Sequence, residues 1–142
     1  MSVVVWDGVT LACDSDMNDG QVKLPFEKIW QKGKHLYGVV GVISECVKLK
    51  TWVRNGCILD WFPQVSPETA LIIVSLPDGI VTRYTVSTTP ISHTGKIALG
   101  TGRDFAYGAM FMGGSAEDGV RAAIKYSASC SGEVITLKGE FT

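Results

Sequence analysis

The chain has 142 residues, of which 46% are hydrophobic and 19% are charged, and its formal net charge is −1. This length and composition predict one folded domain over residues 1–142 and exclude a disordered chain. The near-zero charge provides no general attraction to nucleic acid or anionic lipid, so we expect neither a nucleic-acid partner nor a membrane.

Targeting and cofactor signals are missing from the sequence. No apolar run approaches the roughly 20 residues of a membrane span, and the N-terminal segment lacks the basic region of a signal peptide. The four cysteines, at positions 13, 46, 57 and 130, form no Cys-x-x-Cys pair. We therefore expect a protein of the cytoplasm with free thiols, without a metal or a cofactor.

The first part of the chain predicts a hairpin. Residues 2–6 are β-branched and aromatic, which favours a strand, and Asp7-Gly8 is a strong hairpin turn signal. Residues 9–14 then form the returning strand. The polar run 15–22 predicts a loop.

A second hairpin and a helix follow. The hairpin has arms over 27–31 and 35–42, and the second arm is nearly all apolar, which predicts a central strand. From Ser44 the apolar residues recur at helical spacing, and Asn55-Gly56 is a natural stop, so we expect a helix over 43–55.

The remainder alternates between strands and helices. We expect strands over 70–76, 80–86 and 96–99, then a helix over 103–112, a helix with a capping-box-like start at 115–118, and a last strand over 133–137. Because hairpins outnumber crossovers, the sheets should be mainly antiparallel. The order predicts an α+β fold with two sheets between outer helices, a four-layer αββα sandwich.

Five short segments add detail to this order: Ser2-Val3-Val4-Val5, Ala12-Cys13-Asp14, Phe26-Glu27-Lys28-Ile29, Gly38-Val39-Val40-Gly41, and Leu99 to Ala106 with its Gly100-Thr101-Gly102 turn. Taken together, they resemble the proteasome β-subunit and HslV peptidase family of N-terminal-nucleophile (Ntn) hydrolases, especially its short phage and bacterial members. The resemblance runs over nearly the whole chain and implies the αββα sandwich. It also implies a homo-oligomeric ring, a peptide substrate and an ATPase unfoldase as a candidate partner.

The resemblance assigns a role to several residues. Ser2 would be the nucleophile once Met1 is removed, and its free α-amine would be the base, since an α-amine has an ordinary pKa of about 8. Lys28 would stabilise the hydroxylate, and Asp14 would keep Lys28 charged. The backbone N–H of Gly41 would bind the oxyanion.

Two further positions match the family less closely. Thr101 stands where the family has a serine near the amine. Ser127 stands where the family has an aspartate after the last helix.

Other interpretations remain open. A family member that has lost catalysis would be an oligomeric structural or assembly protein, for example of a phage or its virion. The lysines and arginine of residues 23–54 could instead be a nucleic-acid surface, and Gly100-x-Gly102 resembles part of a dinucleotide-binding motif but lies outside any βαβ unit. Asp14, Lys28 and Gly41 could also have purely structural roles.

Overall fold

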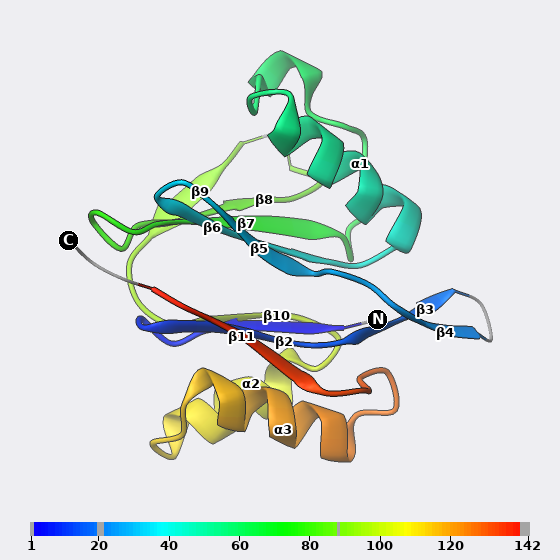
Figure 1. The fold of residues 1–142 in the computed structure, drawn as a ribbon, viewed down its shortest axis with the longest axis vertical. Helices are drawn as coiled ribbons and strands as arrows, with labels where there is room; N and C mark the ends of the chain where they lie inside the picture. Colours follow the sequence, from blue (N-terminus) through cyan, green and yellow to red (C-terminus); the bar gives the residue numbers. More distant parts are fainter. Residues whose placement is uncertain (1, 20–21, 88, 140–142) are drawn as a thin grey trace.

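Two antiparallel sheets lie face to face in the computed structural model, which describes residues 2–19, 22–87 and 89–139 (Figure 1). Helix α1 covers the outer face of one sheet, and helices α2 and α3 cover the outer face of the other. The predicted α+β sandwich with mainly antiparallel sheets is confirmed. Met1 and residues 20–21 of the predicted loop lie outside the described residues.

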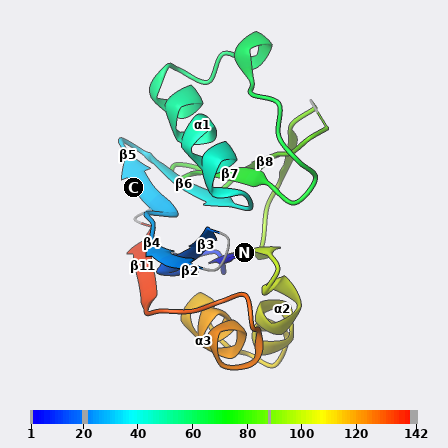
Figure 2. The same cartoon turned by 90° about the vertical axis from the view of Figure 1, so that its right-hand side faces the viewer.

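The four-stranded sheet has the order β10-β1-β2-β11, and its strands are Ile97–Gly100, Val3–Trp6, Thr10–Asp14 and Val134–Lys138. The five-stranded sheet has the order β5-β6-β7-β8-β9, and its strands are Ile29–Lys32, His35–Val40, Ala70–Ser75, Val81–Tyr84 and Ile91–His93. The three α-helices are α1 (Ile43–Arg54), α2 (Arg103–Phe111) and α3 (Ala116–Tyr126). Figure 2 shows the same layers from the side.

The apolar strands are buried on both faces because helices cover both sheets. In β1, Val4 and Trp6 pack between the sheets, whereas Val3 and Val5 pack against α2 and α3. Successive side chains of a strand point to opposite faces, so a strand covered on both sides needs a continuous apolar run. The same rule explains the apolar sequence of β6 and β7.

The polar run after β2 is not a plain loop. Asp16–Asp19 (β3) and Val22–Pro25 (β4) form a two-stranded antiparallel ribbon. Met17 is fully buried and pairs with Leu24. With a single buried apolar residue in β3, the sequence alternation is too weak to predict a strand.

The sequence did not predict two other elements, but it correctly predicted the capping box of α3. A short 3-10 turn covers Leu59–Trp61, and β9 adds an edge strand after β8. The capping box at the start of α3 is present, since the Ser115 hydroxyl accepts from the Asp118 N–H at 3.2 Å and the Asp118 carboxylate accepts from the Ser115 N–H at 2.9 Å. Within the described residues, none of the helices is both long and apolar enough to span a membrane.

Two glycines with different surroundings, one between the sheets and one on an outer helix, predict opposite effects of a change to alanine. A Cβ at Gly38 in β6 would lie 2.9 Å from Val4 Cγ1, so Gly38→Ala should overpack the core and lower the free energy of unfolding by about 1–3 kcal/mol. A Cβ at Gly108 in α2 meets no atom within 4 Å, so Gly108→Ala should raise it by about 0.5–1 kcal/mol. Urea unfolding measures both, and equal effects would contradict the described packing of the sheets.

Candidate active site

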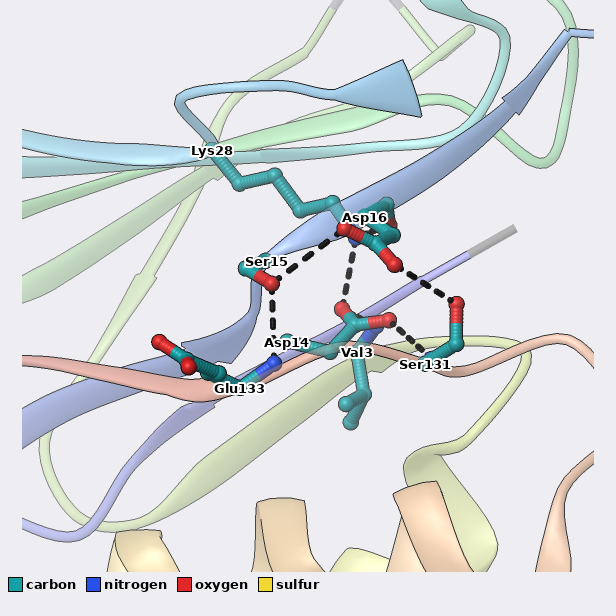
Figure 3. Close-up of polar contacts among 7 residues, drawn as sticks. All are labelled: Val3, Asp14, Ser15, Asp16, Lys28, Ser131 and Glu133. Carbon is teal, nitrogen blue, oxygen red and sulfur yellow. Dashed lines mark hydrogen bonds and ion pairs between the residues drawn. The ribbon is translucent and has the colours of Figure 1, made fainter. Parts of the chain in front are cut away.

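A buried ion pair joins the two sheets. Lys28 lies just before β5 and Asp14 ends β2, and the Lys28 Nζ is 2.6 Å from Asp14 Oδ1 (Figure 3). Both side chains are fully shielded from solvent, at 0% exposure. Lys28 Nζ also donates to the carbonyl oxygen of Asp16. The structure therefore brings together two of the residues that the sequence predicted for the site.

The Asp14 carboxylate accepts two backbone hydrogen bonds besides the contact with Lys28. The Val3 N–H donates to Oδ1 at 3.1 Å, and the Ser131 N–H donates to Oδ2 at 3.1 Å. Val3 begins β1 directly after Ser2, and Ser131 lies between α3 and β11. Asp14 thus fixes the peptide unit that follows Ser2.

Serine and aspartate side chains surround this carboxylate (Figure 3). Asp16 accepts from the hydroxyls of Ser15 and Ser131, each at 3.3 Å, and Ser15 Oγ accepts from the Glu133 N–H at 2.8 Å. Sequence reasoning missed Ser131 and Asp16. The signal that could have found Ser131 is the small polar run 127–132, in which only Ser127 was singled out.

Ser2 lies next to this network with its side chain buried. The residue has 0% exposure, and its Oγ has no hydrogen-bond partner among the described residues. The Gly102 N–H donates to the Ser2 carbonyl oxygen at 3.3 Å. Gly100 has a φ of +95° and approaches this carbonyl so closely that a Cβ would overlap it. Only glycine fits there, so the Gly100 turn determines where Ser2 lies.

Gly41 directly follows β6 of the opposite sheet and has a φ of +115°, at which a Cβ would collide with Thr69. Thr69 Oγ1 accepts from the Val42 N–H at 3.1 Å and donates to Glu45 Oε1 at 2.5 Å. Glu45 also accepts from the N–H and the hydroxyl of Ser66, at 3.0 and 2.9 Å. These bonds hold the Gly41 turn, on which the predicted oxyanion N–H depends.

A cleft of about 410 Å³ opens between the two glycine turns. Val40 and Gly41 line it from one sheet, and Leu99, Gly100 and Thr101 line it from the other. Thr101 is exposed at this cleft. The cleft therefore flanks the start of β1, where Ser2 lies.

Ser127 occupies a different place from the other predicted residues. It caps the C-terminal end of α3, where its N–H donates to the Ala123 carbonyl at 2.8 Å and its hydroxyl accepts from the Ser129 N–H at 3.3 Å. Among the residues that the structure describes, Ser131 rather than Ser127 contacts Asp14.

The cysteines do not provide an alternative nucleophile near Lys28. Burial raises the pKa of the Cys13 thiol to about 12, and it raises the pKa of the Cys46 thiol to about 12 as well. Both thiols therefore stay protonated at neutral pH. Over residues 2–19, 22–87 and 89–139, no three His, Cys, Asp or Glu side chains gather as a metal site would require.

Comparison with solved structures shows that the fold of the chain is of the Ntn hydrolase type. The chain is similar to Thiobacillus denitrificans BPH, with a TM-score of 0.75 and 17% identity over 100% of this chain and 99% of that one. It is also similar to HslV from Trypanosoma brucei, with a TM-score of 0.65 and 18% identity over 96% and 98% of the two chains. A third similar structure is the Anbu (Gly-1) mutant from Hyphomicrobium sp. strain MC1, with a TM-score of 0.75 and 9% identity over 97% and 81%. No protein-family model and no curated protein matches the chain.

The buried ion pair predicts a large difference between two neighbouring substitutions. Lys28→Met leaves the Asp14 carboxylate buried without its cation and should lower the free energy of unfolding by about 3–5 kcal/mol. Glu27→Gln removes the exposed contact between Glu27 and Lys50 and should cost less than about 1 kcal/mol. Denaturant unfolding compares the two, and a small loss in both variants would refute a buried ionic contact.

The Gly41 turn predicts a change in acid stability. Burial acts to raise the pKa of the Glu45 carboxyl, but hydrogen bonds from Thr69 and Ser66 outweigh it, and the pKa is lowered from 4.5. A pKa that is lower in the folded state gives stability that is present above the unfolded pKa and is lost as pH falls through the folded pKa. Between neutral pH and roughly pH 3, the wild type should therefore lose more stability than Glu45→Gln.

The matched control for this change is Glu133→Gln, which removes an exposed carboxyl elsewhere on the surface. Unfolding is followed across the acid range for all three proteins. If Glu45→Gln loses as much stability as the wild type on acidification, the hydrogen bonds of Glu45 do not favour its charged form.

Proposed function

We propose that the chain is a subunit of a proteasome- or HslV-like peptidase whose nucleophile is the Ser2 hydroxyl. The observation that carries the proposal is the buried Ser2 Oγ, which has no partner among the described residues. Ser2 directly precedes the peptide N–H that Asp14 holds, and its carbonyl lies against Gly100, which lines the cleft. A buried hydroxyl without a partner costs free energy, which a reacting group would explain.

Catalysis in this proposal begins with removal of Met1, which frees the α-amine of Ser2. As Ser2 Oγ attacks the substrate carbonyl carbon, its proton passes to the α-amine. The Gly41 N–H donates to the developing oxyanion, and Lys28 stabilises negative charge near the hydroxyl. The peptide C–N bond then breaks, the leaving amine takes the proton, and an ester on Ser2 remains.

Water completes the reaction in the second half. The α-amine takes a proton from water as the water oxygen attacks the ester carbonyl, and Ser2 Oγ takes the proton back as the acid product leaves. Asp14 does not contact the substrate in this scheme. It is a positioning residue, because it fixes both Lys28 and the Val3 N–H.

We also propose assembly into a homo-oligomeric ring. Support comes from exposed apolar side chains on the α2–α3 layer: Phe111 is 88% exposed, Met112 81% and Tyr126 65%. Phe111 and Met112 lie at the end of α2, and Tyr126 stacks on Phe105 near the start of that helix. Exposed large apolar groups along a helical layer are typical of contacts between proteins. Nothing among the described residues points to an ATPase, which stays a prediction, as does a location in the cytoplasm.

A second candidate function is an oligomeric assembly protein without catalysis. Two observations favour it: Ser2 has 0% exposure, and the segment from Ser127 to Gly132 contains no acid. The fold is the same in both cases, so a chemical test on Ser2 decides between them.

The test combines intact mass with covalent labelling. The purified protein should lack Met1 and should react with epoxomicin, the electrophilic compound bound in a second structure of Thiobacillus denitrificans BPH. The label should map to the N-terminal peptide that begins at Ser2. Ser2→Ala should lose both the label and cleavage of unfolded peptides, whereas Ser92→Ala, a change at an exposed serine of β9, should keep both.

Retention of Met1 would remove the base and favour the assembly protein. A label on any residue other than Ser2 would likewise refute the assignment of the nucleophile.

A further inference from the structure

We propose that the cleft binds an acidic side chain of the peptide substrate and that Arg83 pairs with its carboxylate. This inference rests on the proposed function for its substrate, and on Arg83 for its chemistry. Arg83 belongs to β8, far along the chain from every residue that the sequence singled out.

The sheet register places Arg83 at the cleft. Arg83 pairs with Ile72 of β7, and Ile72 packs between the two sheets. Residues directly opposite each other on antiparallel strands share a face. The Arg83 side chain is therefore on the inner face of its sheet, and it lines the cleft together with Gly41 and Gly100.

The Arg83 guanidinium has no partner among the residues that the structure describes. Its Nε is buried without a hydrogen bond, and among the described residues its side chain makes no ion pair. Arg83 as a whole is half-buried, but its buried N–H donor is costly unless it forms a hydrogen bond. A ligand carboxylate fits this need, because the planar guanidinium can donate two parallel hydrogen bonds to it.

The charged side chains that line the cleft include more cations than acids. Its charged lining consists of Arg83, Arg103 and Glu68. Arg103 lies at the rim, where its Nη1 donates to the Gly100 carbonyl at 3.3 Å. Its side chain is 58% exposed, and its Nε lies 4.0 Å from the Asp104 carboxylate, outside the cleft lining. Glu68 is exposed and forms no ion pair with either arginine in the described structure. Arg83 is therefore the cation of the lining that forms no ion pair among the described residues.

The walls of the cleft favour a side chain with an apolar stem and a charged end. Val40, Ala70, Ala98, Leu99 and Tyr107 supply the apolar lining. A volume of about 410 Å³ suits one or two side chains of a peptide. Apolar walls also weaken screening by water, which strengthens pairing between a guanidinium and a carboxylate. Glutamate or aspartate meets these conditions.

The position of the cleft relates binding of an acidic side chain to the proposed reaction at Ser2. Gly41 and Gly100 both line the cleft, and Gly100 also lies against the Ser2 carbonyl. A peptide whose carbonyl reaches Ser2 would therefore place a neighbouring side chain in the cleft. Arg83 would be a specificity-determining residue of the same site.

The first experiment compares three fluorogenic tripeptides that carry Glu, Gln or Lys next to the scissile bond. The wild type should show a kcat/KM for the Glu peptide roughly 10- to 100-fold above that for its Gln isostere, which is the range expected for a hydrogen bond between charged groups. Arg83→Gln should bring the ratio close to one. Arg121→Gln, a change of an exposed arginine on α3, is the matched control and should keep the preference.

The second experiment separates this inference from the proposed function. Calorimetry measures binding of the same peptides to Ser2→Ala and to Ser2→Ala with Arg83→Gln, so no cleavage is needed. If the wild type cleaves nothing but Ser2→Ala binds the Glu peptide at least 10-fold more tightly than the Gln peptide, only the proposed function fails. Equal binding of Glu and Gln peptides, no binding, a preference for Lys, or a Glu preference that survives Arg83→Gln would each overturn the role of Arg83. Urea unfolding confirms that the variants are folded.

Discussion

The Lys28–Asp14 contact is the interaction on which the rest of the site depends. It crosses from one sheet to the other, and the same carboxylate holds the start of β1 and the segment after α3. Desolvating two charges offsets much of their attraction, so a buried ion pair adds little net stability. What it provides here is geometry: the peptide unit after Ser2, the ammonium group of Lys28 and the backbone of Ser131 are fixed relative to one another.

The cleft follows from two turns that only glycine can form. Gly41 and Gly100 both have positive φ, and at each position a side chain would collide with neighbouring backbone. These turns end β6 and β10, which lie in opposite sheets. Because both strands end near the start of β1, the sandwich leaves an opening there without any strand being interrupted. Thr69 and Glu45 then hold the Gly41 side of that opening.

The sequence predicted most of the fold because covered strands and amphipathic helices leave strong local patterns. The apolar run of β6 and the capping box at Ser115 are examples. The site was less predictable. Asp14 and Lys28 were found through a family resemblance, whereas Ser131 contacts Asp14 across 117 residues of chain, and no local pattern shows that pairing. Arg83 was missed for the same reason, since alternation along β8 cannot show that its inner face borders a cleft.

Two buried polar atoms without hydrogen-bond partners link the proposed nucleophile with the cleft. Among the described residues, the buried side-chain nitrogen and oxygen atoms without a hydrogen bond are Ser2 Oγ and Arg83 Nε. They come from opposite sides of the sandwich: Arg83 lines the cleft, and Ser2 lies against Gly100, which lines it too. Each would be less costly as an apolar side chain if its role were only to fill space. In the proposed peptidase, a hydroxyl next to a fixed peptide unit and a guanidinium in the cleft would suit one ligand, a peptide with an acidic side chain. Oligomer contacts through α2 and α3 would need neither group, which is an argument for the proposed peptidase over an assembly protein without catalysis.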